Sequence, residues 1–209
     1  MIRFSRYSFR VEKLYSKIAG RRSRQRGNVM IESVLTFIPT LAMFLGIVDV
    51  SLVIFLQSTL TNATLEGVRW AITYQSTYNG TSCASSQAAC VAQVVENNCY
   101  GFLSSTQTNL VTVNYYTANN LGTPVETCNG GTCTQTGTLP QTLSNGTVVS
   151  YANQPGNVVQ VVVAGYPWNW LFPVSASGYH LTASSINLGA TSMDVLGGLA
   201  VGTTVPPNP

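Results

Sequence analysis

The sequence contains few of the residues that most enzymes use for catalysis. It has a single histidine, His180, and after residue 26 it has one basic residue, Arg69, and no lysine. A hydrolase triad needs a histidine that an acid orients toward a nucleophile, and no motif surrounds His180. Glycine-rich phosphate loops and metal-binding motifs are also missing from the sequence. These absences disfavour an enzyme, and we expect no cofactor, no metal and no small-molecule substrate.

The basic residues that are present lie almost entirely at the N-terminus. Nine of the ten Lys and Arg residues precede residue 27, whereas six of the seven acids follow it. Such a basic arm could bind nucleic acid. The next segment favours a membrane instead, because residues 34–56 form an apolar run with a single charge that is long enough to cross a bilayer as a helix. Positive charge at one end marks the cytoplasmic side of such a span.

A buried core helix and a secretory signal peptide are weaker explanations of this apolar run. A signal peptide has a shorter apolar region, of about 7 to 15 residues, which ends at a small-residue cleavage site. Here no Ala-x-Ala site follows the run. Any cleavage should precede the span, at Gly27, because glycine most easily adopts the irregular backbone that a protease needs.

The helical pattern continues beyond the apolar run to about Tyr74. Small and apolar residues recur on one face of this continuation at Leu56, Leu60, Ala63, Gly67 and Ala71. A stripe that narrows from leucine to alanine and glycine permits close packing. We expect it to pack onto the attached domain rather than onto another subunit.

A characteristic set of features lies between residues 26 and 71. It comprises an Arg-Gly pair at 26–27, Glu32, Pro39, the GIVD segment at 46–49, and Asn62, Ala63, Glu66, Gly67, Arg69 and Ala71. This set resembles the TadE family of pseudopilins from tight-adherence pilus systems, and Gly27 to Glu32 resembles a type IV prepilin processing site. The resemblance implies a bacterial inner-membrane protein, cut between Gly27 and Asn28 by a prepilin peptidase, with other pilins or pseudopilins as partners. Ser33 departs from the pattern, since many members carry an aromatic residue after the glutamate.

Two acids lie within the apolar segment, where an ionisable residue is by default a candidate functional site. The resemblance implies that Glu32, the fifth residue after cleavage, pairs with the N-terminal amino group of a neighbouring subunit. An acid is also favourable in the first turn of a helix, so Glu32 could simply mark the membrane interface. For Asp49, contact with an assembly partner and a partly hydrated position at the interface are equally open.

The rest of the sequence predicts a domain of one short helix and several strands. Residues 74–87 read as a loop, and 85–97 as a helix with apolar positions at Ala88, Val91, Val94 and Val95. Strands are predicted at 110–117, 146–152, 157–168 and 179–190, which are rich in valine, threonine and tyrosine. The fold class is therefore α+β, with a long N-terminal helix, first transmembrane and then extracytoplasmic, a small helix and an antiparallel β-rich domain.

The expected organisation has five parts. They are a basic cytoplasmic leader (1–27), a transmembrane helix (28–56), an extracytoplasmic continuation of that helix (57–76), an outer α+β domain (77–196) and a flexible tail (197–209).

The five cysteines all lie in the predicted outer part, which agrees with an oxidising compartment. The sequence CNGGTC predicts a hairpin closed by a Cys128–Cys133 disulfide, because two glycines can form the tight turn. One further bridge among Cys83, Cys90 and Cys99 would leave one thiol, either free or joining two chains. Zinc is the competing explanation, but no CxxC pair or histidine cluster supports it.

An unusual aromatic segment, GYPWNWLFP, lies at 165–173. Trp168, Trp170 and Phe172 alternate along it, which indicates a strand edge or loop with one aromatic face. Such a face most often completes the core of its own domain. It could instead form an interface with another pilus subunit or with the membrane surface, where amphipathic aromatic residues are favoured.

Together these features predict a TadE-like pseudopilin or minor pilin, a structural or assembly component of a tight-adherence pilus. The alternative is an unprocessed, single-pass membrane-anchored domain that binds a surface or an envelope partner.

Overall fold

The computed structural model describes residues 8–75, 77–82, 87–103, 109–142, 146, 148–171, 175–176, 179–180 and 185–197, with the backbone alone at 8–28, 81, 175–176 and 179–180. The chain divides into two compact units, residues 1–50 and residues 51–209. We call the second unit the α+β domain. Cys83, Phe172 and residues 198–209 of the predicted tail lie outside the described residues.

The longest element is the helix α1, Ser8–Ile72. It begins well before residue 28, where the sequence indicated a helix start, and it passes through Gly27 without a break. Arginine, lysine and leucine in the leader are good helix formers, and they outweigh the cost of about 1 kcal/mol for one interior glycine. Pro39 also lies inside the helix. Membrane helices tolerate such a proline because neighbouring groups satisfy the carbonyl that it frees.

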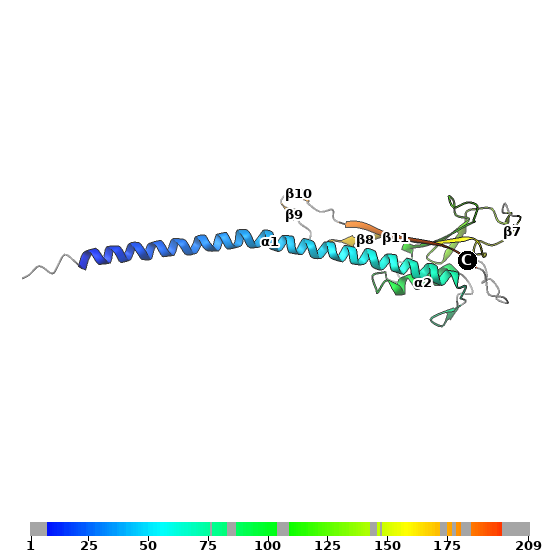
Figure 1. Ribbon diagram of the computed structural model, residues 1–209, viewed down its shortest axis with the longest axis horizontal. Coiled ribbons are helices and arrows are strands. Elements are labelled where there is room, and N and C mark those ends of the chain that lie inside the picture. Colours follow the sequence, from blue (N-terminus) through cyan, green and yellow to red (C-terminus); the bar gives the residue numbers. More distant parts are fainter. Residues whose placement is uncertain are drawn as a thin grey trace, which may run out of the picture. The chain divides into compact units, whose positions relative to one another are not determined.

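The α+β domain is built on a five-stranded antiparallel sheet with the strand order β11-β8-β3-β4-β5. The strands are β3 (Val111–Tyr116), β4 (Glu126–Asn129), β5 (Thr132–Gln135), β8 (Val158–Asn169) and β11 (Ser185–Val195). The predicted strands at 110–117 and 157–168 are therefore confirmed as β3 and β8. Figure 1 shows β8 and β11, in yellow and orange, running alongside the cyan part of α1.

Three short strand pairs lie outside this sheet, and they correct parts of the sequence prediction. They are β1 (Thr77–Tyr78) with β2 (Thr81–Ser82), β6 (Gln141–Thr142) with β7 (Val148–Val149), and β9 (Ser175–Ala176) with β10 (Tyr179–His180). The predicted loop at 74–87 contains a hairpin, because Asn79 and Gly80 both adopt the positive φ that a two-residue turn requires. The predicted strand at 146–152 is shortened to β7, and the one at 179–190 is divided between β10 and the longer β11.

The core of the domain lies between the sheet and two helices. The predicted short helix is confirmed as α2, Gln87–Asn98, and its four apolar positions are buried. The predicted stripe on α1 is also buried, as expected for packing onto the attached domain. Together these observations confirm the α+β fold class.

Gly67 lies where α1 closely approaches the rest of the core. A β-carbon added there would lie 2.6 Å from Cγ2 of Val95 and 3.6 Å from Cγ1 of Val161. Val95 belongs to α2 and Val161 to β8, so both elements contact the helix at this glycine. Any side chain at position 67 would have to displace a buried valine.

Candidate functional site

The first unit presents an exposed apolar helix surface between residues 29 and 50. The large hydrophobic side chains of this segment that are more than one-third exposed are Val29, Met30, Ile31, Val34, Leu35, Phe37, Ile38, Leu41, Met43, Phe44, Ile47 and Val50. The helix from Val29 onward is long and apolar enough to cross a membrane. A hydrocarbon core needs about 20 helical residues, and the segment 29–50 supplies that length. Leu56, which ended the predicted span, is fully buried in the core of the α+β domain.

Glu32 lies on the exposed surface near the start of this segment. Its carbonyl oxygen accepts a hydrogen bond of 2.6 Å from the hydroxyl of Thr36. The hydroxyl of Ser33 donates in the same way to the carbonyl oxygen of Val29, at 2.8 Å. Serine at this position therefore satisfies its own polar group within the helix, which explains how the segment accepts it in place of an aromatic residue.

Asp49 is buried, with 3% of its surface exposed. Contact with an assembly partner and a partly hydrated position at the interface both stay predictions for this residue. Burying a carboxylate is costly unless other groups compensate for the lost water. The role of Asp49 in assembly stays a prediction.

The C-terminal end of α1 is fixed to the domain by a buried polar network that the sequence pattern did not indicate. The side-chain amide of Gln87 donates to the carbonyl oxygen of Ala71 at 2.9 Å, and the hydroxyl of Tyr115 donates to Oε1 of Gln87 at 3.3 Å. Helix ends leave carbonyl groups that need partners from outside the helix. Here Gln87 supplies the shorter of two hydrogen bonds to the Ala71 carbonyl, which also accepts one from the Tyr74 amide at 3.4 Å. The role of Gln87 depends on three segments that are distant in the sequence.

Burial raises the pKa of several groups around this network. It raises the pKa of Tyr74 to about 12, and it also raises that of the Tyr115 hydroxyl and the Glu126 carboxyl. In each case the first cause is the loss of water around the charged form. The inner side of the domain therefore favours neutral side chains.

The cysteines close one predicted hairpin. Cys128 and Cys133 form a disulfide, with their Cα atoms 3.9 Å apart and Gly130 and Gly131 at positive φ in the turn between them. This confirms the bridge expected from CNGGTC. Cys90 is also disulfide-bonded, whereas Cys99 is a free, buried thiol.

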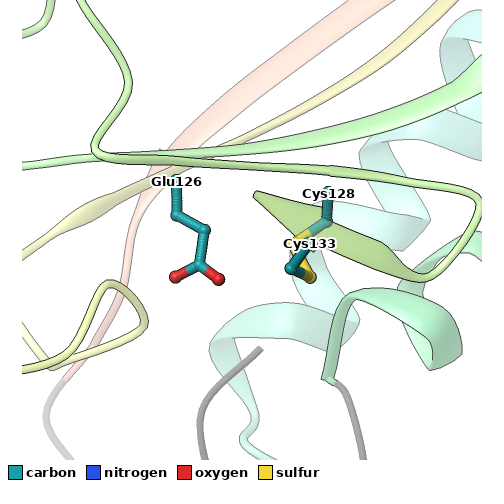
Figure 2. Close-up of side chains that lie close together, drawn as sticks. All are labelled: Glu126, Cys128 and Cys133. Carbon is teal, nitrogen blue, oxygen red and sulfur yellow. A yellow bond between two sulfur atoms is a disulfide. The ribbon is translucent and has the colours of Figure 1, made fainter. Parts of the chain in front are cut away.

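A potential metal-binding group includes this hairpin. A carboxylate oxygen of Glu126 and the two hairpin sulfurs lie within 4.8 Å of one another. Figure 2 shows the Glu126 and Cys128 side chains on the same side of β4 and the sulfurs joined to each other. A metal needs deprotonated thiolates, which the disulfide consumes, so the oxidised domain uses these cysteines as a crosslink.

The aromatic segment joins the end of β8 to the core. Tyr166, Trp168 and Trp170 are half-buried, and the first two pack against the core cluster. This agrees with the expectation that such a face completes the domain's own core. The indole N–H groups of Trp168 and Trp170 are shielded from solvent and have no hydrogen-bond partner among the described residues.

Cys99 provides a test of the cysteine arrangement. Burial, and to a smaller extent the negative charge of Glu96, raises the pKa of its thiol from 9.0 to about 12. We expect the folded, oxidised chain not to react with a thiol reagent at neutral pH, and the unfolded chain to expose this thiol. The folded state favours the neutral thiol of Cys99 over the thiolate. The stabilisation from burying this thiol should therefore be complete below pH 9 and should be lost as the pH rises toward 12. Labelling with and without denaturant checks this, and rapid labelling of the native chain would contradict it.

The comparison with known families identifies the segment that carries these features. Residues 27–69 match the family model described as TadE-like protein. The match begins at Gly27 and extends into the buried stripe of α1, and it covers about a fifth of the chain. The resemblance to the TadE-like family is thus confirmed for this segment. No curated protein and no solved structure matches the chain.

Proposed function

We propose that this chain is a TadE-like pseudopilin or minor pilin, a structural component that takes part in assembling a tight-adherence pilus. The observation that carries the proposal is the start of the family match at Gly27, directly before the exposed apolar helix. The basic leader then lies in the cytoplasm, α1 crosses the bacterial inner membrane once, and the α+β domain lies outside. The disulfide is consistent with an oxidising compartment for that domain.

In the proposed mechanism, a prepilin peptidase removes residues 1–27. Asn28 then carries a new positively charged amino group at the membrane interface. Glu32 lies one helical turn away, and it is exposed rather than packed within its own chain. In an environment of low dielectric constant, the carboxylate and the amino group of a neighbouring subunit would attract each other strongly. Glu32 is the assembly contact in this proposal. Asp49 is a second candidate, and because it is buried in the single chain, its side chain would have to become accessible before it could contact a partner.

The N-terminus of the membrane-bound protein tests this function. We expect it to begin at Asn28 in cells that contain a prepilin peptidase, and at Met1 when the peptidase is deleted. An intact leader in the wild-type cell would instead support an unprocessed, membrane-anchored domain that binds a surface or an envelope partner.

Replacing Glu32 tests its role in assembly. We expect Glu32→Ala to be processed normally but to co-purify with much less of its partner pilins, because the pairing carboxylate is gone. The matched control is Glu66→Ala, which removes another exposed acid of α1. Glu66 bonds to Arg69 at 2.6 Å on the surface, and such exposed pairs contribute little to stability. Equal recovery of partners by the Glu32 variant and the control would contradict the assembly role.

A further inference from the structure

Strands β8 and β11 extend as a two-stranded ribbon beyond the rest of the sheet. β3 pairs with β8 only as far as Val163, whereas β11 continues to pair with β8 as far as Asn169. We call residues 166–171 together with 185–188 the ribbon tip. The tip therefore has no third strand beside it among the described strands.

Two side-chain contacts show which way the ribbon runs along α1. The hydroxyls of Thr64 and Ser192 lie 2.9 Å apart, and the side-chain amide of Gln57 donates to the carbonyl oxygen of Gly189 at 2.6 Å. Moving toward the N-terminus of α1 therefore means moving toward the start of β11. The two paths agree in length, since seven helical residues and three strand residues each span about 10 Å.

The same geometry gives the level that the tip reaches. From Gly189 to Ser185 the strand advances by about 13 Å, at about 3.3 Å per residue. From Gln57 to Ser51 the helix axis advances by only about 9 Å. The ribbon tip thus reaches the level of Ser51, where the α+β domain begins and the exposed apolar segment 29–50 ends.

The composition of the ribbon suits a lipid interface. No Lys, Arg, Asp or Glu occurs between Glu126 and Asp194, so the ribbon tip carries no formally charged side chain. It contains Tyr166, Trp168 and Trp170, each of which is half-buried and keeps part of its surface exposed, and the side chain of Leu171 is 57% exposed. Tryptophan and tyrosine are enriched where a membrane protein passes from hydrocarbon to water.

A second aromatic group lies at nearly the same level of the helix. The rings of Phe55 and Phe102 meet edge to face, with their centroids 6.2 Å apart. Phe102 follows α2, and two residues earlier Tyr100 is 83% exposed in a left-handed turn. The polar layer on each side of a bilayer is about 5 to 7 Å thick, so this turn and the ribbon tip would both fall near one interface.

We propose that the ribbon tip rests in the outer interfacial layer of the lipid bilayer that α1 crosses, and gives the α+β domain a membrane contact of its own. This proposal requires α1 to span a membrane, but it does not require processing or pilus assembly. We expect the tip to contact lipid rather than a second protein, because it reaches the level of Ser51, where the exposed apolar segment of α1 ends, and because it carries no charge that would repel it from that layer.

Fluorescent labels on the full-length chain in liposomes test the proposal. Leu171→Cys places a label on the ribbon tip, and Tyr151→Cys places one near the opposite end of β8, where Tyr151 is similarly exposed at 53%. The buried Cys99 stays unlabelled, so the parent chain gives the background. We expect iodide in the outer solution to quench the label at 171 several-fold less than that at 151. A nitroxide on the upper part of the lipid chain should quench the label at 171 more strongly.

A third label tests separately whether α1 spans the membrane, which the proposed membrane contact of the ribbon tip requires. Met43 is 72% exposed in the apolar segment of α1, and a label on Met43→Cys should be quenched by a nitroxide deep in the bilayer. If that label is quenched while the label at 171 is as open to iodide as the one at 151, the membrane contact is refuted. Protection of residue 171 only when partner pilins are added would also refute it and identify a protein interface. Failure to quench at residue 43 would refute the spanning helix, and with it the proposal.

Discussion

Gly27→Ala leaves the chain at full length in cells that contain a prepilin peptidase; this is the result expected if residue 27 is the processing site. The helix α1 continues through Gly27, so a peptidase has to unwind it locally before it can cut the peptide bond to Asn28. Alanine favours a helix over glycine by about 1 kcal/mol, which alone would reduce the unwound population about fivefold. An added methyl group beside the scissile bond should remove most of the remaining cleavage.

The matched control for this experiment is Gly46→Ala. Gly46 lies in the same helix, and a β-carbon there would have no neighbour within 4 Å. This variant should mature normally, and intact-mass measurement of the membrane-bound protein distinguishes the two chain lengths. Equal maturation of both variants would show that Gly27 is an ordinary helix residue.

Gly67→Leu is expected to weaken the packing of the α+β domain around α1. Even the first carbon of the new side chain would overlap Cγ2 of Val95, at 2.6 Å, and Val95 is fully buried. Overpacking of a dense core commonly costs about 1 to 3 kcal/mol, and a leucine at a helix-to-helix contact should lie at the upper end of that range. Limited proteolysis of the full chain should therefore digest the domain of the variant much faster.

Two further variants separate overlap from a general effect of substituting glycine. Gly46→Leu adds the same side chain at a position where the new β-carbon would meet nothing within 4 Å outside the local helix backbone, and the protease resistance of the domain should not change. Gly67→Ala combined with Val95→Ala should be less destabilised than the sum of the two single variants, because the shorter residue at 95 makes room for the new methyl group. Simple additivity would contradict the contact, since residues that touch normally show coupling.

The features predicted successfully from the sequence are those that depend on local patterns. The stripe from Leu56 to Ala71 follows the period of a helix, and the Cys128–Cys133 bridge follows from two glycines in a four-residue turn. Both are set by neighbouring residues, so a single sequence is enough to predict them. The same holds for α2, whose apolar spacing is regular.

The features that were missed depend on contacts between distant segments. Gln87 caps α1 only because Tyr115 and Ala71 are brought beside it in the folded domain. The spacing of Cys83, Cys90 and Cys99 gave no means of identifying Cys99 as the free thiol. Hydropathy could not show that Asp49 is buried. It depends only on the residue types along the chain, and these are the same whether the acid faces solvent or a packed region.

The absence of charge between Glu126 and Asp194 has a consequence for how the β-rich part of the domain interacts with its surroundings. Dissolved salt weakens attraction between exposed charges over about 10 Å at 0.1 M ionic strength, but it has little effect on contacts made by neutral side chains. Binding through this part of the chain should therefore change little between dilute and saline media.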